Sequence, residues 1–167
     1  MIAETLSTAR LTLRKPLAGD VPAYTAYCMS DRAGFVGGPF TEAQAFEKYC
    51  AMAGHWALRG YGRYVMVHNG APIGHVGPLG IDAGQPEMTW TLWDGAAEGK
   101  GLATEAATAV WDHLRAQDWP EMIIRILPDN AASIAIARRI GATQTDEAAP
   151  AWYEGALTFR LRREVPA

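Results

Sequence analysis

Two closely spaced glycines, Gly99 and Gly101, stand directly before an alanine-rich helical pattern in the stretch that runs from Glu98 to Ala106. Glycine lets backbone N–H groups approach a ligand without a Cβ in the way, and the first amides of a helix have no acceptor within the helix. Because the helix dipole adds positive charge at the same point, the stretch favours binding of an anion such as a phosphate. The same glycines also fit a plain turn that starts a helix, so the surrounding elements must decide between the two interpretations.

Metal binding and thiol chemistry are the other activities that the residue types could support. The two cysteines, Cys28 and Cys50, are too few for a disulfide framework and lie far from any cluster of histidines. The histidines show no metal-ligand spacing of the His-Glu-x-x-His kind. They are His55, His68, His75 and His113. We therefore expect no metal, two buried thiols and structural roles for the histidines.

The composition is that of a globular protein. Of the 167 residues, 49% are hydrophobic and 20% are charged, which suits a single domain over residues 1–167. No apolar run approaches the ~20 residues that cross a bilayer, and Glu4 and Thr5 stand where a signal peptide would be basic. We therefore expect a cytoplasmic protein without a membrane partner. The net charge of -3 and the pI of about 5.8 argue against a nucleic-acid partner.

Before the glycines, the spacing of apolar residues is first typical of helices and then of strands. A short strand is predicted at 11–14, and a helix capped by Asp20 follows it. Thr41 begins a capping-box pattern that opens a second helix, which should end near Gly60. The next residues predict an antiparallel meander with a hairpin turn at Asn69-Gly70. Its three strands are 61–68, 72–79 and 87–93.

After the glycines, helical and extended patterns alternate. Apolar residues at helical spacing between 102 and 114 fall on one face of a helix. Residues 122–126 form a nearly continuous apolar strand, which is typical of a strand covered on both faces. A further helix is predicted from Asn130 to Gly141, and an alternating strand at 156–162 closes the sheet. The sequence therefore predicts an α/β domain with a mixed sheet.

The chain resembles the GNAT superfamily of acetyl-CoA-dependent N-acyltransferases in an ordered set of five segments: 87–93, 99–106, 122–126, 129–133 and 139–141. Residues 6–14 also resemble the opening strand of the ribosomal-protein N-terminal acetyltransferase (RimJ/RimL-like) group, to which the resemblance is closer. The resemblance covers nearly the whole chain. It implies an α/β GNAT fold with four helices and a mixed, mostly antiparallel sheet of six or seven strands. That sheet splays apart between strand four (87–93) and strand five (122–126).

The resemblance implies that the glycine stretch holds the pyrophosphate of acetyl-CoA. The cofactor-binding residues that carry over are Gly99, Lys100, Gly101, Leu102, Ala103 and Thr104. The family pattern is Gln or Arg, two residues, Gly, any residue, then Gly or Ala, and Gly101 and Ala103 match it. Glu98 stands at the position of the Gln or Arg. A carboxylate beside a pyrophosphate is repulsive unless it points away or pairs with a cation such as Lys100, so Glu98 fits least well.

The same resemblance places the pantetheine arm of the cofactor between the splayed strands. It would pair there with backbone near Leu92 and Trp93, where an N–H group can also hold the oxyanion. Asn130 matches the family asparagine that contacts this arm, although N-capping of its helix accounts for the residue equally well. Ser133 is the candidate acid for the leaving thiolate, or a hydroxyl that bonds locally at the helix start. Arg139 would reach the phosphates, or would only complement the helix dipole.

An amine acceptor must lose a proton before it attacks, because its pKa of ~10.4 keeps it protonated at neutral pH. Glu87 is the candidate base, since many relatives carry a Glu at this position. Alternation places Glu87 on the same face of its strand as Thr89, Thr91 and Trp93. The other interpretation is an exposed carboxylate at a strand end.

The prediction is an enzyme that moves an acetyl group from acetyl-CoA directly to a primary amine in a ternary complex, without a covalent intermediate. The amine is that of a protein N-terminus or of a small molecule. The alternative is a binding or sensor module that keeps the fold but has lost turnover. The reason for considering this alternative is Glu98, because its carboxylate would weaken the cofactor site. A P-loop nucleotide site is set aside because Gly101 follows Lys100 where Ser or Thr would hold magnesium.

The amine acceptor has no motif of its own. The acidic net charge favours a cationic small molecule or peptide. By position in the fold, four aromatic residues are expected to border the acceptor site: Trp56, Tyr61, Trp152 and Tyr153. An exposed terminal strand would also suit a homodimer.

Overall fold

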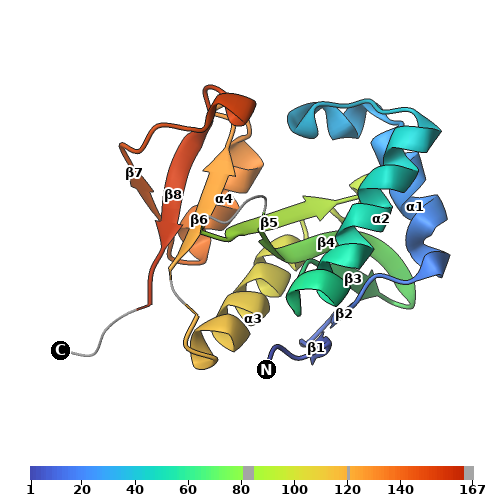
Figure 1. The fold of residues 1–167 in the computed structure, drawn as a ribbon, viewed down its shortest axis with the longest axis horizontal. Helices are drawn as coiled ribbons and strands as arrows, with labels where there is room; N and C mark the ends of the chain where they lie inside the picture. Colours follow the sequence, from blue (N-terminus) through green and yellow to red (C-terminus); the bar gives the residue numbers. More distant parts are fainter. Residues whose placement is uncertain (81–84, 120, 164–167) are drawn as a thin grey trace.

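A mixed sheet of eight strands forms the centre of the molecule (Figure 1), in the order β1-β2-β3-β4-β5-β6-β8-β7. The computed structural model describes residues 1–80, 85–119 and 121–163. The strands are β1 (Thr5–Ser7), β2 (Thr12–Arg14), β3 (Tyr64–His68), β4 (Ala71–Leu79), β5 (Glu87–Leu92), β6 (Met122–Ile126), β7 (Thr143–Thr145) and β8 (Leu157–Leu161). The α-helices within these ranges are α1 (Val21–Cys28), α2 (Glu42–Arg59), α3 (Leu102–Ala116) and α4 (Ala131–Arg139). Short 3-10 helices are η1 (Ala18–Asp20), η2 (Asp31–Val36), η3 (Gly95–Ala97) and η4 (Ala151–Tyr153).

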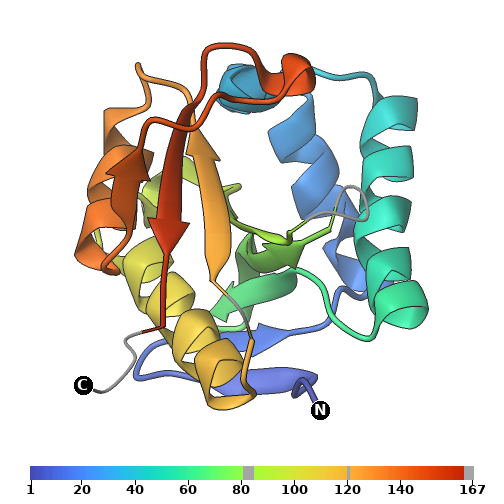
Figure 2. The ribbon, with the colours of Figure 1, turned by 60° about the vertical axis from the view of Figure 1, so that its left-hand side comes forward.

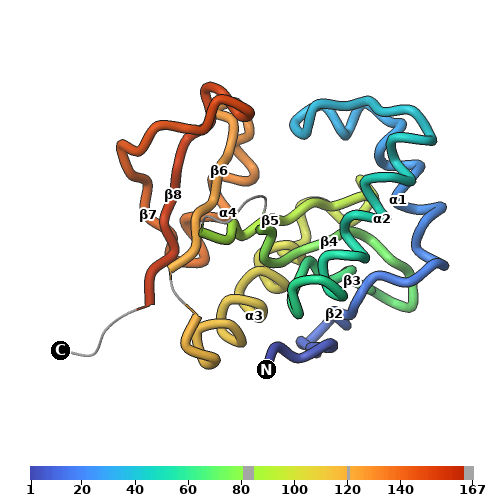
Figure 3. The backbone as a smooth tube through the Cα atoms, in the orientation of Figure 1, coloured from blue at the N-terminus to red at the C-terminus, as the bar shows by residue number. Residues whose placement is uncertain are grey.

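The sheet changes character between β5 and β6. Its other neighbouring strands are antiparallel, whereas β5 and β6 are parallel and share one paired position, Glu87 with Ile123. Figures 1 and 3 show the two strands diverging beyond that point. The predicted α/β fold with a splayed, mostly antiparallel sheet is confirmed. The described strands number eight rather than six or seven because the short strands β1 and β7 pair at its two edges.

Helices cover both faces of the sheet (Figure 2). Side chains alternate between the faces along a strand, so neighbouring residues of β3 belong to different cores. Val65 lies in the cluster under α1 and α2, together with Tyr49 and Trp93. Met66 lies in the larger cluster under α3 and α4, together with Val110. The face of the sheet under α1 and α2 is therefore separate from the face that packs against α3, the helix that follows the two glycines.

Local sequence signals set most of these boundaries. Thr41 caps α2 by accepting a hydrogen bond from the Gln44 amide at 3.2 Å, and Gly60 ends the helix with φ 72°. Asn69 and Gly70 both have positive φ (50° and 80°), as a tight hairpin turn between β3 and β4 requires. These three predictions are confirmed. The strand after Gly60 begins at Tyr64, three residues later than expected.

Two residue-level expectations are wrong. Asp20 stands at the N-cap position of α1, but its side chain makes no cap hydrogen bond. Its carboxylate instead accepts two hydrogen bonds from Arg14, both at 2.8 Å, because a guanidinium matches a carboxylate in paired geometry. Of the two thiols, Cys28 is buried and Cys50 is exposed on α2, where the apolar face of the helix does not reach it.

Candidate functional site

The backbone before α3 needs both glycines of the predicted phosphate loop. Gly99 has φ 71° and Gly101 has φ 74°, values that residues with a Cβ rarely adopt. Gly101 is the N-cap of α3 and has no side chain, so the first amides of this 15-residue helix have no side-chain cap. A Cβ at Gly99 would meet nothing within 4 Å, which leaves space beside the loop. This arrangement can bind an anionic group at the helix N-terminus.

Two residues of the segment before β2 form hydrogen bonds to this loop and to the first turn of α3. Arg10 donates to the Lys100 carbonyl oxygen at 2.8 Å and to Glu105 Oε2 at 2.7 Å, and Thr8 donates to Glu105 Oε1 at 2.6 Å. Burial opposes the charge of Glu105, but the hydrogen bonds from Thr8 and Arg10 outweigh it and lower the pKa of this carboxyl. Leu102, at the first position of α3, is buried in the core and therefore offers a ligand its backbone amide.

Glu98, which departs from the family pattern, has a cationic partner from a distant segment. Arg32 of η2 donates from Nη2 to Glu98 Oε1 at 2.8 Å and to the Leu92 carbonyl oxygen at 3.0 Å. The partner is thus Arg32 and not Lys100, the cation close to it in sequence. A groove of about 430 Å³ lies beside the pair, lined by Asp31, Arg32, Gly34, Phe35 and Glu98. The ion pair offsets the negative charge next to the phosphate loop.

The edge of β5 that faces β6 can be identified from one backbone hydrogen bond. The Trp93 amide donates to the Ile73 carbonyl oxygen at 2.7 Å and is therefore occupied on the β4 side. Because amides alternate between the two edges of an antiparallel strand, the Leu92 amide points to the opposite edge, toward β6. The backbone role predicted for Leu92 fits this geometry. The role predicted for the Trp93 amide does not, because the sheet already uses that N–H.

The first turn of α4 faces β5 across the divergence. Asn130 Oδ1 accepts a hydrogen bond from the Ser133 amide at 3.2 Å, so its N-capping role is confirmed. Trp90 of β5 donates from Nε1 to Ser133 Oγ, also at 3.2 Å. A hydroxyl that accepts from an indole keeps its own proton available to donate. Arg139 is exposed in the last turn of α4, and no described carboxylate forms an ion pair with it.

Glu87 is buried at the start of β5, at the one position where β5 and β6 are paired. It forms an ion pair with Arg125 of β6, so the interpretation as an exposed strand-end carboxylate is wrong. The Arg125 guanidinium lies 6.0 Å from the centroid of the Trp152 ring. Tyr153 donates from its hydroxyl to the Phe35 carbonyl oxygen at 3.2 Å. The Trp152-Tyr153 segment therefore lies near the diverging strands, and the role of Glu87 as a base stays a prediction.

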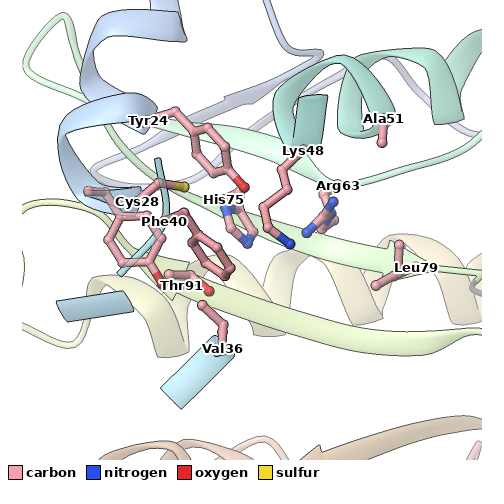
Figure 4. Close-up of a pocket in the computed structure, with 11 residues that line it drawn as sticks. Tyr24, Cys28, Val36, Phe40, Lys48, Ala51, Arg63, His75, Leu79 and Thr91 are labelled. Carbon is pink, nitrogen blue, oxygen red and sulfur yellow. The ribbon is translucent and has the colours of Figure 1, made fainter. Parts of the chain in front are cut away.

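A cavity of about 300 Å³ lies between the α1/α2 layer and the sheet (Figure 4). It is lined by Tyr24, Tyr27, Cys28, Val36, Phe40, Lys48, Ala51, Arg63, His75, Leu79 and Thr91. Trp56 and Tyr61 are not among these residues: Trp56 packs against Tyr64 in the core, and Tyr61 packs against Trp119. Neither residue therefore borders this cavity, and their place at the acceptor site stays a prediction. The sequence signals for the cavity were polar residues in apolar surroundings, namely Arg63 before β3 and His75 within β4.

Burial sets the protonation states in this cavity. Trp93 donates from Nε1 to His75 Nδ1 at 2.9 Å, which assigns the proton of the neutral imidazole to Nε2. Burial, and after it the charge of Arg63, lower the pKa of His75 well below its usual range, so the ring is neutral. Burial likewise raises the pKa of Tyr27 to about 12, so its hydroxyl keeps its proton. The structural role predicted for His75 is consistent with these contacts.

Neither a metal-binding cluster nor a membrane-spanning helix occurs in the part of the chain that the structure describes. No group of three or more His, Cys, Asp or Glu side chains there could hold a metal ion. No helix over the same residues has the length and apolar character to cross a membrane.

Comparisons with known proteins agree with this geometry. The model of the acetyltransferase (GNAT) domain matches residues 10–143. The chain therefore belongs to the GNAT acetyltransferase family, and this membership makes it an N-acetyltransferase. A search of curated proteins gave no match.

Solved structures with the same fold include acetyltransferases from several bacteria. One from Agrobacterium tumefaciens str. C58 is 32% identical, with a TM-score of 0.87 over 96% of this chain and 95% of that one. A putative GnaT-family acetyltransferase from Bordetella pertussis is 27% identical, with a TM-score of 0.78 over 97% and 100%. RimL, a ribosomal L7/L12 alpha-N-protein acetyltransferase solved in complex with coenzyme A, has a TM-score of 0.76 over 95% and 98%. At 18% identity, RimL shows the shared fold alone.

Proposed function

We propose that this chain transfers the acetyl group of acetyl-CoA directly to a primary amine in a ternary complex. The observation that carries the proposal is the divergence of β5 and β6 after a single paired position, beside the glycine-capped start of α3. Acetyl-CoA is the acetyl donor of the GNAT family, and RimL was solved with coenzyme A. Bound acetyl-CoA supplies the acetyl group as a reactive thioester.

The residues around the divergence suit the cofactor that the family uses. The backbone amides from Gly99 to Thr104 would hold the pyrophosphate, because the positive φ angles leave this turn open and the helix dipole favours an anion. The backbone of Leu92 would pair with the pantetheine arm and hold the oxyanion. Asn130 would contact the same arm while its side chain caps α4.

Two side chains would handle the protons. Glu87, which forms an ion pair with Arg125, would accept a proton from the acceptor ammonium directly or through water. Ser133 would pass its hydroxyl proton to the leaving thiolate and take up the second proton of the attacking amine in return, directly or through water, with Trp90 as a positioning residue that orients the oxygen. No covalent enzyme intermediate is required in this scheme. A cytoplasmic location and a homodimer also stay proposals, drawn from the composition and from the exposed terminal strand.

The main physical argument for the alternative function, a CoA-binding module without turnover, is weakened by the structure. It was based on repulsion between Glu98 and a pyrophosphate, and Arg32 offsets that charge at 2.8 Å. The two functions differ in whether an amine stimulates release of the CoA thiol.

The test is a thiol-release assay with acetyl-CoA and a panel of primary amines. We expect amine-dependent release, a loss of about a hundredfold in kcat for Glu87→Gln, and a smaller loss for Ser133→Ala. Glu4→Gln, which removes an exposed partner of Lys15, is the matched control and should leave kcat unchanged. Binding of CoA without release by any amine would favour the module, and absence of CoA binding in calorimetry would refute both functions.

A further inference from the structure

The cavity under α1 and α2 lies beside the strand at which the acetyl group is proposed to sit. Thr91 of β5 and its register partner His75 of β4 both line the cavity. The opposite edge of β5 is the one that diverges from β6. The cavity is therefore placed to receive the acceptor, and its assignment as the acceptor site rests on the proposed acetyltransferase function.

Two cations reach into this cavity, and none of the described residues that line it carries a negative charge. Figure 4 shows the Lys48 ammonium and the Arg63 guanidinium directed into the same space in front of His75. The eleven lining residues include no Asp or Glu. Among the described residues, no carboxylate forms an ion pair with Lys48 or Arg63.

The surroundings make these charges available to a ligand. Burial opposes the charge of Arg63 and lowers its pKa, yet a guanidinium stays protonated in proteins, so a desolvated cation remains. The neutral His75 ring adds no positive charge but can donate from Nε2. The Lys48 ammonium lies 4.3 Å from the centroid of the Phe40 ring, and both side chains line the cavity. A partly buried cation without a partner is unfavourable, and an anion would relieve that cost.

Size and lining limit the ligand further. A volume of about 300 Å³ is at the lower end of small-molecule sites, too small for a folded partner. Tyr24, Tyr27 and Phe40 supply aromatic walls. Because their pKa values are raised by burial, the two tyrosines stay neutral and contribute no negative charge.

We propose that the acceptor is a small primary amine that also carries an anionic group, a carboxylate or a phosphate, bound by Arg63 and Lys48 against an aromatic wall. This replaces the expectation of a cationic acceptor drawn from the net charge. The net charge is a property of the whole surface, whereas the acceptor meets the local charges of the cavity.

The first test compares matched amines in the thiol-release assay. Phenylalanine is compared with phenylalaninamide, and phosphoethanolamine with ethanolamine, so that the two pairs distinguish a carboxylate from a phosphate. We expect the anionic member of at least one pair to have the higher kcat/KM, by about tenfold or more. Arg63→Gln and Lys48→Met should each reduce this preference. Arg115→Gln, which removes an exposed cation of α3, is the control and should retain it.

Two outcomes overturn the proposal while leaving the acetyltransferase function intact. One is equal kcat/KM within both pairs, and the other is an anion preference that survives both substitutions. Failure of all amines would instead count against the proposed function, so a binding measurement without turnover is needed as well.

That measurement is calorimetry with 3-phenylpropanoate and phenyl phosphate, anions that have no amine. We expect at least one to bind wild type and to bind Arg63→Gln and Lys48→Met about tenfold more weakly. Lys48 is exposed on α2, so its variant should fold even where Arg63→Gln does not. Unchanged affinity in the variants, or no binding of either anion to wild type, would contradict the proposal.

Discussion

At the scale of single residues, Glu98 and Arg32 act as one unit. Glu98 replaces the Gln or Arg of the family pattern, but the Arg32 guanidinium lies 2.8 Å from its carboxylate and also bonds the Leu92 carbonyl oxygen. The cation that neutralises the Glu98 carboxylate is supplied from η2, 66 positions away in the sequence. Inspection of the loop alone could not reveal this partner, because pairing depends on how η2 folds back over β5.

The pair predicts a specific non-additivity in CoA affinity. Arg32→Ala should weaken CoA binding by about three- to tenfold, because it leaves a carboxylate uncompensated beside the phosphates. Glu98→Gln should change affinity little in wild type but restore most of the loss in the Arg32→Ala background. Isothermal titration calorimetry on the four proteins measures the coupling, with Arg115→Ala as a control that should bind CoA as wild type does. Additive effects of the two substitutions would show that the ion pair does not shield the site.

At the scale of elements, the turn into α3 combines backbone strain with a binding role. Gly99 and Gly101 adopt left-handed φ angles where the chain must bend into the helix. Gly60, at the end of α2, has a similar φ of 72° but no connection to the phosphate loop. A Cβ would meet nothing within 4 Å at Gly60 or Gly99, so in both places alanine is opposed by backbone conformation and not by crowding.

The similarity of Gly60 and Gly99 allows the effect of backbone strain on stability to be measured separately from the effect on CoA binding. Gly99→Ala and Gly60→Ala should each lower the free energy of unfolding by about 1–2 kcal/mol, the cost of a left-handed alanine. Gly99→Ala alone should also raise the Kd for CoA, by about tenfold, because the loop amides move. Urea unfolding and calorimetry on both variants check the two quantities. Equal CoA affinity in the two variants would remove Gly99 from the binding loop.

The same elements show what the sequence can and cannot predict. Capping boxes, the Asn-Gly turn and helical periodicity are local signals, and they correctly placed α2, the β3–β4 turn and α3. The family resemblance correctly placed the divergence of β5 and β6. The cavity was missed because its lining comes from separated segments of the chain. Trp56 and Tyr61 lie outside this cavity, because aromatic residues fill cores as readily as they line sites.

At the scale of the whole molecule, η2 links the two halves of the splayed sheet. Arg32 joins it to Glu98 and the end of β5, and the Phe35 carbonyl accepts a hydrogen bond from Tyr153, just before β8. Beneath it, His75 and Trp93 connect β4 and β5 in the core that α1 and α2 cover. A charge placed in that core would act on both the cavity and the packing of the helical layer.

Stability should therefore depend on pH through His75. Its pKa in the folded protein lies well below the ordinary value of 6.5, because of burial first and Arg63 second. Below pH 6.5 the unfolded chain takes up a proton that the folded protein excludes, so the stability present above that pH is lost as the pH falls. The slope can reach about 1.4 kcal/mol per pH unit for one proton. The lowered pKa of Glu105 adds a loss of the same sign only at more acidic pH, below its ordinary value of 4.5.

Urea unfolding between pH 7.5 and pH 5 measures this dependence. Wild type should lose stability below pH 6.5, and His75→Gln, whose side-chain oxygen can still accept from the Trp93 indole, should lose less over the same range. His68→Gln, a change in a half-buried histidine of β3 that bonds the Arg10 carbonyl oxygen, is the control and should keep the wild-type slope. If His75→Gln also kept the wild-type slope, the loss of stability at low pH would not come from the protonation of His75.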